Sequence, residues 1–234
     1  MFSKFHACFC RQNTIIFIYD YQTGLLDSVL DAKKITNLRT AAVAVHSIHL
    51  LAKSDYKIVS FVGLGEIGKT TLQILIETTD RPLIIRLFNY KNRAGIFKEK
   101  YKDNKLINIE IFEDFEDMVK DSDVVVSAIT YAEKDFADES IYKKGVLLVP
   151  IHTLGFQNCD LTFDKIFGDD LSHICGFKYF NSFKRFNEIS EVLNNKCEGR
   201  VNDDERIIAY NIGIALHDIA LAKIYIDKLK LLKN

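Results

Sequence analysis

The chain of 234 residues contains no tryptophan, two prolines and five cysteines, and its charges nearly cancel. The cysteines, at positions 8, 10, 159, 175 and 197, are odd in number and lack C-x-x-C spacing, which indicates reduced thiols and predicts neither a disulfide framework nor a metal site. The net charge is −1 and no basic block occurs, so a nucleic acid or an anionic membrane is not an expected partner.

Long apolar runs are also lacking. The most apolar stretch, Ile207 to Leu232, is interrupted by polar and charged residues, which favours a core helix over a membrane span. Lys4 and Arg11 interrupt the apolar residues that follow Met1, so no secretory signal is predicted and we expect a cytoplasmic protein. A content of 48% hydrophobic and 27% charged residues is typical of a globular protein.

The most informative segment is residues 57–71, KIVSFVGLGEIGKTT, which satisfies two phosphate-binding patterns at once. One is G-x-G-x-x-G, formed by Gly63, Gly65 and Gly68, and the other is G-x-x-x-x-G-K-T, which adds Lys69 and Thr70. Both patterns need an apolar strand before the glycines and a helix after them, and the sequence offers a strand ending at the glycines and a helix from Glu66 onward.

The dinucleotide interpretation gives each glycine a task. Gly63 makes the tight turn, Gly65 lets a pyrophosphate approach the backbone, and Gly68 lets helix and strand pack closely. Backbone amides at the helix start, at Glu66 and Ile67, would then face the phosphates.

The nucleoside-triphosphatase interpretation leaves Gly65 without a required role. It would place Lys69 on the phosphates and Thr70 on magnesium, and it needs a later apolar strand that ends in aspartate. No later strand candidate ends that way, so the context favours a dinucleotide.

Predicted strands and helices alternate beyond the glycines. Strands are expected at 57–63, 83–88, 107–111, 123–129 and 145–150, and helices at 66–78, 92–101 and 114–120. This alternation predicts an α/β fold, a Rossmann-type doubly wound parallel sheet. Outside it, we expect strands at 15–19 and 25–30, a helix over 37–53 capped by Thr36, and a final helix over about 203–231 with Gly213 in its middle.

Three segments together resemble the ornithine cyclodeaminase and mu-crystallin family. Residues 36–42, TNLRTAA, are similar to the family's T-x-x-R-T-A-A, residues 63–68 to its G-x-G-x-x-G, and residues 209–218, AYNIGIALHD, to its closing S-x-G-x-A-x-x-D helix. The segments follow the family's order, and the resemblance extends from about Ile15 to Tyr225.

The resemblance implies a nicotinamide cofactor, a Rossmann domain, and a second, smaller α+β domain made from both chain ends that binds a small amino or imino acid and forms homodimers. The expected division is residues 1–53 and 201–234 for that domain and 54–200 for the NAD(P)-binding domain. Members of the family share hydride transfer at an amino-acid α-carbon or an imine carbon.

Arg39 matches the family's carboxylate-binding arginine. In a helix over 37–53 it falls in the first turn, where its guanidinium and nearby backbone amides could receive a carboxylate together. The alternative is a solvated surface arginine, and the motif favours the substrate role.

The cofactor preference is argued from the end of the second Rossmann strand. An acidic residue about 20 positions past the glycines would bind the ribose of NAD. The sequence has Asn89 there, followed by Lys91 and Arg93, and two cations without a carboxylate suit the 2′-phosphate of NADP, although both could also be solvated residues of a helix start. At the end of the fourth strand, Ser127, Ala128 and Ile129 are expected to flank the nicotinamide ribose.

Two departures from the family bear on activity. Leu154 stands where the family has its proton-handling aspartate, and leucine cannot move a proton. His152, at the carboxyl edge of the sheet, is the candidate acid or base because its unperturbed pKa would suit that work, and a structural turn histidine is an equal alternative. The chain also looks shortened at its amino end, where the family supplies a further arginine and a lysine.

Three functions therefore stay open. The first is an NAD(P)-dependent oxidoreductase that resembles ornithine cyclodeaminase, the second is a non-catalytic NAD(P)-binding remnant of that family, and the third is a P-loop NTPase that uses Lys69 and Thr70.

Overall fold

Two compact units make up the described part of the chain, residues 14–232, in the computed structural model. The larger unit is the continuous segment 41–212, and the smaller one combines the described residues before 41 with those after 212. Helix α1, Ala32–Leu51, begins in the smaller unit and ends in the larger one.

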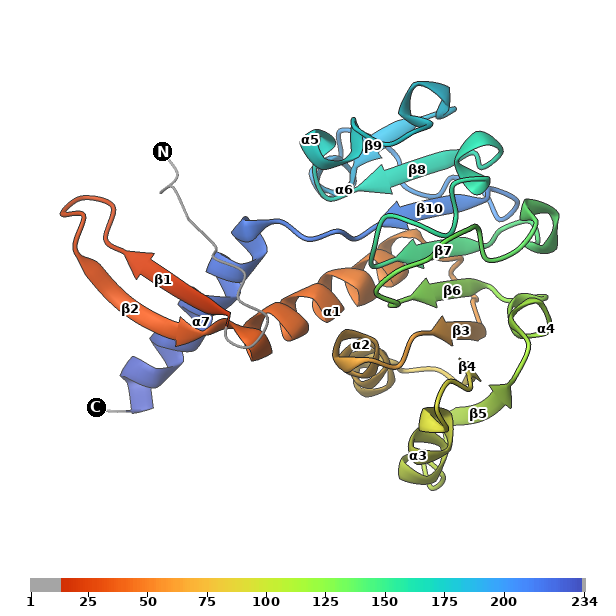
Figure 1. Cartoon of the computed structure of the whole chain (residues 1–234), viewed down its shortest axis with the longest axis horizontal. Helices are drawn as coiled ribbons and strands as arrows, with labels where there is room; N and C mark the ends of the chain where they lie inside the picture. The colour runs from red at the N-terminus through yellow and green to blue at the C-terminus, as the bar shows by residue number, and fades with distance from the viewer. Residues whose placement is uncertain (1–13, 233–234) are drawn as a thin grey trace. The chain divides into compact units, whose positions relative to one another are not determined.

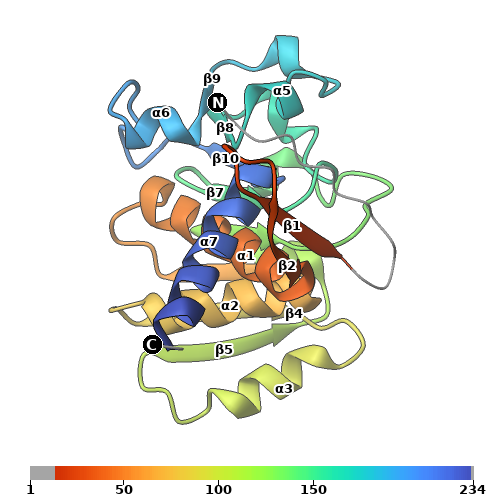
Figure 2. The same ribbon diagram turned by 90° about the vertical axis from the view of Figure 1, so that its left-hand side faces the viewer.

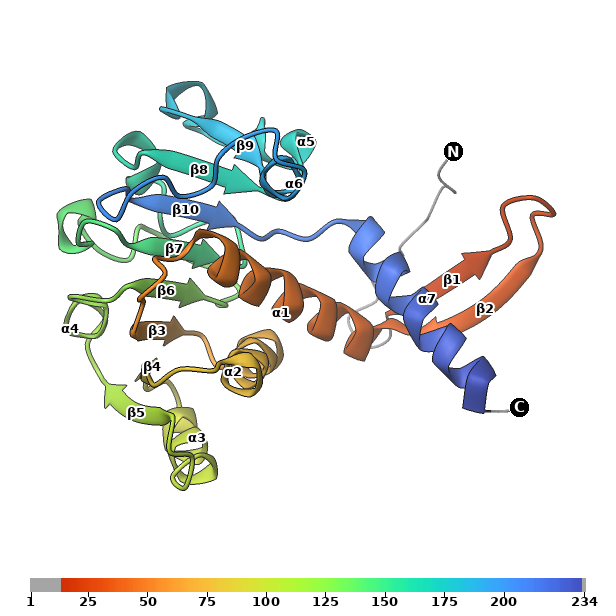
Figure 3. The same ribbon diagram turned by 180° about the vertical axis from the view of Figure 1, so that it is seen from behind.

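The larger unit is built on one eight-stranded sheet in which every strand pairing is parallel. Its order is β5-β4-β3-β6-β7-β10-β8-β9, which Figures 1 and 3 show from the front and from behind. The strands are β3 Ile58–Val62, β4 Leu83–Phe88, β5 Ile107–Phe112, β6 Val124–Ser127, β7 Leu147–Pro150, β8 Lys165–Gly168, β9 Phe186–Glu188 and β10 Ile207–Tyr210. The predicted Rossmann-type α/β fold is confirmed, with the order reversing between β3 and β6.

Helices cover both faces of this sheet. Alternate residues of β6 enter opposite cores: Val124 and Val126 pack in a cluster that also contains Leu72 of α2, whereas Val125 packs in one with Met118 of α4. A strand that is apolar on both faces is the expected result of helices on both sides. The helices are α2 Glu66–Thr78, α3 Arg93–Lys100, α4 Phe115–Val119, α5 Leu171–Ile174 and α6 Ile189–Leu193, with short 3₁₀ turns at Glu139–Ile141, Cys159–Leu161 and Phe180–Ser182.

The end of the larger unit differs from the prediction. The final helix expected over 203–231 is wrong at its start, because residues 207–210 form β10 inside the sheet and α7, Ala215–Leu232, begins later. The run IIAY is fully buried, and a short run that is apolar throughout has no periodicity by which a strand can be told from a helix. No helix among residues 14–232 has the length and apolar character needed to cross a membrane.

The smaller unit contains a two-stranded antiparallel sheet and α7. Strands β1, Ile15–Tyr19, and β2, Leu26–Asp31, lie close to the strands expected at 15–19 and 25–30, and they pair as a hairpin whose turn contains Gly24 at φ +68°. Helix α7 runs beside this hairpin (Figure 2), and Lys230 of α7 lies 3.8 Å from the Asp27 carboxylate.

Helix α1 starts earlier than predicted. The carboxylate of Asp31 accepts a hydrogen bond of 3.0 Å from the backbone N–H of Lys33, so Asp31 caps this helix start and Thr36 lies inside the helix. Arg39 is consequently about two turns into α1, and the expected help from free first-turn amides does not exist there.

Candidate functional site

The turn between β3 and α2 consists of Gly63, Leu64 and Gly65. Gly63 has φ +89°, and a Cβ added to it would lie 2.6 Å from the carbonyl carbon of Ala128. A Cβ added to Gly68 would collide with the carbonyl oxygen of Gly63. Both positions therefore need glycine, the first for its backbone conformation and both for close packing.

Gly65 is glycine for a different reason. It is the N-cap of α2, no side chain caps that helix start, and a Cβ added to it would meet no other atom of residues 14–232 within 4 Å. The first amides of a helix, here those of Glu66 and Ile67, have no partner within the helix. Open space before uncapped amides fits a pyrophosphate.

The same geometry argues against the triphosphatase pattern. Helix α2 has already begun at Glu66, so Lys69 lies within it and its ammonium is 3.5 Å from the Glu66 carboxylate. The hydroxyl of Thr70 donates to the Glu66 carbonyl at 2.8 Å, as helical threonines commonly do. A turn of three residues leaves no long loop to surround a triphosphate.

The carboxyl ends of four neighbouring strands bring the predicted cofactor residues together. In the paired rows, Val62 of β3 faces Ser127 of β6, and Phe88 of β4 faces Phe112 of β5. One residue further along each strand, the next row therefore contains Ala128, Gly63, Asn89 and Glu113. This row crosses the point where the strand order reverses, the expected place for a dinucleotide.

The two predicted cations at the end of β4 already have contacts. The ammonium of Lys91 lies 5.1 Å from the centre of the Tyr90 ring, and Lys91 and Asn92 both have positive φ, +54° and +56°. Arg93, the first residue of α3, donates from Nη1 to the carbonyl of Leu64 at 3.2 Å. Arg93 thus ties this turn to the glycine turn.

Glu113 is a residue that sequence reasoning missed. Its carboxylate accepts a hydrogen bond of 2.6 Å from the side-chain amide of Asn89. Its position in the sequence could have identified it, because Glu113 is the first residue after β5 and Asn89 is the first residue after β4.

His152 follows β7 and contacts Ser127 at the end of β6. Its Nδ1 accepts from the backbone N–H of Leu154 at 3.3 Å, so in the neutral ring the proton is on Nε2, which lies 2.5 Å from the Ser127 hydroxyl oxygen. Burial lowers the pKa of His152 to about 4, and Phe136 and Phe156 are its aromatic neighbours. The expectation that His152 has an unperturbed pKa is therefore wrong. Its ring is a neutral hydrogen-bond donor at physiological pH.

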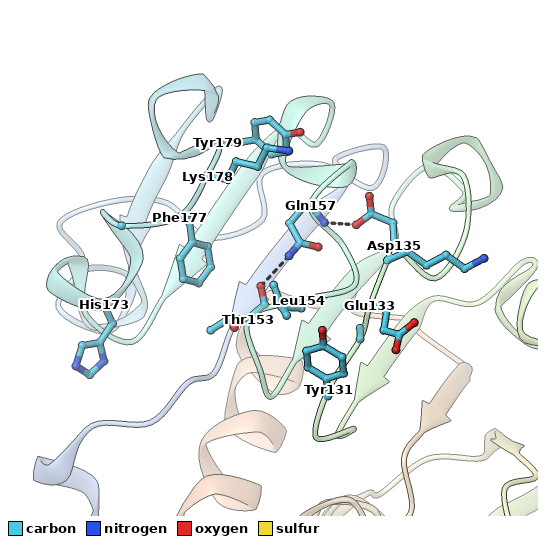
Figure 4. Close-up of a pocket in the computed structure, with 13 residues that line it drawn as sticks. Tyr131, Glu133, Asp135, Thr153, Leu154, Gln157, His173, Phe177, Lys178 and Tyr179 are labelled. Carbon is cyan, nitrogen blue, oxygen red and sulfur yellow. Dashed lines mark hydrogen bonds between the residues drawn. The ribbon is translucent and has the colours of Figure 1, made fainter.

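A pocket of about 650 Å³ opens beside Thr153 and Leu154, which follow His152 in the chain (Figure 4). The loops after β6, β7 and β8 line it with residues 131–135, 153–154, 157, 173 and 176–179. Leu154 is one of them and is 38% exposed. The backbone N–H of Gln157 donates to the carboxylate of Asp135 at 2.8 Å and so links two of the loops. Carboxylates and ammonium groups both line the pocket, so no single charge dominates it.

Arg39 lies in the smaller unit within a defined polar cluster. Its Nε donates to Asp218 of α7 at 3.0 Å, and the same carboxylate oxygen accepts from the Thr36 hydroxyl at 2.9 Å. Nη1 of Arg39 is buried and has no hydrogen-bond partner among residues 14–232. Gly213 has φ +91° outside α7, and a Cβ there would collide with this Nη1, so close packing of Arg39 explains the glycine.

The described residues offer no metal-binding group of three or more histidine, cysteine, aspartate or glutamate side chains. Cys159, Cys175 and Cys197 are free thiols, whereas Cys8 and Cys10 lie outside the described residues.

The parallel sheet, the glycine turn and the uncapped start of α2 together define a protein with a Rossmann-type α/β fold. Residues 6–232 match the ornithine cyclodeaminase/mu-crystallin family, and the chain belongs to that family. The resemblance first indicated by three short motifs is thereby confirmed.

Curated relatives and solved structures agree with this assignment. The chain is 26% identical to N-((2S)-2-amino-2-carboxyethyl)-L-glutamate dehydrogenase of Staphylococcus aureus, over 91% of this chain and 67% of that protein. It is 22% identical to a Δ¹-pyrroline-2-carboxylate reductase of Bacillus cereus, over 90% and 69%. The structure of the Thermococcus litoralis Δ¹-pyrroline-2-carboxylate reductase with NADH and L-proline superimposes with a TM-score of 0.73 at 21% identity, covering 90% of this chain and 70% of that one.

Proposed function

We propose that this protein is an NAD(P)-dependent oxidoreductase that acts by hydride transfer on a small amino or imino acid. The observation that carries the proposal is the open space at Gly65, in front of the uncapped amides of α2 and at the switch point of the sheet. Family membership supports it, as do the relatives named as a Δ¹-pyrroline-2-carboxylate reductase and an N-((2S)-2-amino-2-carboxyethyl)-L-glutamate dehydrogenase.

Different residues at the switch point would bind different parts of the cofactor. The amides beside Gly65, at Glu66 and Ile67, would hold the pyrophosphate, and Asn89, Lys91 and Arg93 would surround the adenosine ribose. Ser127, Ala128 and Ile129 would flank the nicotinamide ribose. A bound nicotinamide cofactor supplies the hydride acceptor or donor that amine oxidation or imine reduction requires.

Arg39 is proposed to bind the substrate carboxylate. Asp218 holds Nε, which fixes the plane of the guanidinium and leaves the buried Nη1 as a donor. A carboxylate would satisfy this buried donor, whose isolation otherwise costs about 1–3 kcal/mol. The cluster is therefore suited to an amino or imino acid.

His152 is proposed as a positioning residue that donates to Ser127 and leaves the serine hydroxyl proton for the cofactor or substrate. A neutral imidazole and Leu154 provide no acid at this place. An iminium substrate already carries its proton on nitrogen, so hydride addition to it requires no acid there.

We propose that the protein acts as a homodimer paired through the smaller unit. That unit exposes an unusual number of large apolar side chains, on β1, β2 and α7, which an interface would cover. They are Ile15, Phe17, Tyr19, Leu26, Val29, Ile224, Tyr225 and Leu229, each at least 39% exposed.

The test has a binding part and a turnover part. NADH and NADPH are titrated by their own fluorescence, and the oxidation of the reduced cofactor is then followed with a panel of cyclic imino acids and of α-keto acids with amines. The oxidoreductase predicts saturable binding and turnover with at least one imino acid. Binding without turnover would favour a cofactor-binding remnant, for which Leu154 is the specific observation, and binding of magnesium-ATP alone would contradict the proposal.

A further inference from the structure

At the adenosine end of the candidate site, the first residue after β4 is the one placed to contact the ribose. In dinucleotide-binding sheets a carboxylate at this place accepts hydrogen bonds from the ribose hydroxyls and disfavours a 2′-phosphate. Here the residue is Asn89, whose amide can present either an acceptor or donors, depending on its orientation.

Glu113 fixes that orientation. It lies beside Asn89 in the row beyond the paired ends of β4 and β5, where the backbone N–H of Asn89 also donates to the carbonyl of Phe112 at 2.8 Å. A carboxylate only accepts hydrogen bonds, so the 2.6 Å contact requires the amide nitrogen Nδ2 to face Glu113. The amide oxygen Oδ1 must then face away from Glu113.

That oxygen lacks a partner. Oδ1 of Asn89 is buried and accepts no hydrogen bond among residues 14–232. A ribose hydroxyl can donate to it, whereas a 2′-phosphate dianion carries acceptors and would face both Oδ1 and the charge of Glu113. The orphaned acceptor is thus complementary to NAD(H).

The two cations of this turn do not reverse the argument. Arg93 directs Nη1 to the Leu64 carbonyl, and Lys91 lies over the exposed Tyr90 ring. Both act at the rim, where solvent screens charge, whereas Oδ1 of Asn89 is buried.

We propose that Glu113 is a specificity-determining residue that, by orienting Asn89, makes the protein select NAD(H) over NADP(H). This inference rests on the proposed function and reverses the NADP preference drawn from the sequence. Glu113, which follows the neighbouring strand β5, would thus provide the preference for NAD(H) that a carboxylate directly after β4 provides in other dinucleotide-binding sheets.

The experiment measures dissociation constants of NADH and NADPH by fluorescence for the full chain and five variants. For the wild type we expect NADH to bind at least about tenfold more tightly. Glu113→Gln, which lets the amide of Asn89 pair in either orientation, should lower that ratio to about threefold or less, and Glu113→Lys should favour NADPH. Asn89→Asp should raise the preference for NADH.

Two controls separate orientation from general charge. Glu116→Gln removes a nearby exposed carboxylate that forms no hydrogen bond with Asn89, and Lys98→Ala removes an exposed cation of α3; each should leave the ratio within about twofold of the wild type. Thermal melting verifies that each variant is folded.

The outcomes separate this inference from the proposed function. Tighter binding of NADPH by the wild type, or a ratio that Glu113→Gln does not change, would overturn the role of Glu113 while leaving a nicotinamide-binding protein. Failure of folded wild type to bind either nucleotide would overturn both.

Discussion

The two units of this protein differ in how completely they bury what their sequences make apolar. In the larger unit, helices on both sides of the sheet leave strands such as β6 and β7 fully buried, with a core on each face. In the smaller unit, the hairpin has apolar residues on both faces, and Phe17 and Val29 stay 40% and 54% exposed. The proposed cofactor site therefore lies on a unit whose apolar strands are covered on both faces, whereas the proposed carboxylate cluster belongs to a unit with apolar surface left exposed.

The largest expected effect is on the glycine turn of the larger unit. Gly63→Ala places a Cβ 2.6 Å from backbone atoms at a φ of +89°, so we expect NADH affinity to fall by about a hundredfold or more, together with a lower melting temperature. Gly24→Ala is the matched control, because Gly24 also has positive φ but open space around it. Equal loss of cofactor binding in both variants would contradict the steric account.

The next effect concerns the smaller unit. Asp218→Asn removes the charge that holds Nε of Arg39, and we expect KM for the imino acid to rise about tenfold to a hundredfold while the NADH dissociation constant is unchanged. Arg39→Lys keeps the charge without the forked donors and should raise KM similarly. A change in NADH affinity of the same size would show that the two units do not divide the work in this way.

A third, smaller effect concerns the pH dependence of stability in the larger unit, where Asp160 is buried. Burial raises the pKa of Asp160 to about 7, and Tyr210 donates to its Oδ1 at 2.8 Å. The pKa of Asp160 in the folded state lies above the unfolded value of 3.8. The contribution of this carboxyl group to the stability of the folded state is therefore fully present below pH 4 and is lost as the pH rises toward and through 7.

Asp160→Asn should accordingly be more stable than the wild type at pH 8, by on the order of 3 kcal/mol, and the difference should vanish toward pH 4. Urea unfolding at several pH values measures it. A difference in stability that does not depend on pH would mean that burial does not raise the pKa of Asp160.

Much of the sheet was predictable because its strands and helices have different periods. The bounds 66–78 and 83–88 agree with α2 and β4, where helical and β-branched patterns are bounded by Gly65 and Pro82. Strands β8, β9 and β10 are not predicted: β8 has only two apolar residues between Lys165 and Gly168, β9 has three residues, and β10, which is apolar on both faces, falls within the predicted final helix.

The candidate site was predictable only where one residue's identity carries the chemistry. Gly63 and Gly68 fit their predicted tasks in the tight turn and in helix–strand packing, whereas Gly213 lies outside the helix predicted around it and packs closely against Arg39. The state of His152 and the pairing of Asn89 with Glu113 depend on burial and on strand register, which the local sequence does not encode.

The most direct test of the account is NADH binding to a Gly65→Val variant beside Lys69→Ala. The Cβ of valine at position 65 would have no other atom of residues 14–232 within 4 Å, and its methyl groups would occupy the open space before α2. The variant should therefore melt like the wild type yet bind NADH at least about tenfold more weakly, whereas Lys69→Ala should change the affinity by less than about twofold. Unchanged binding by Gly65→Val, with loss of binding by Lys69→Ala, would contradict it.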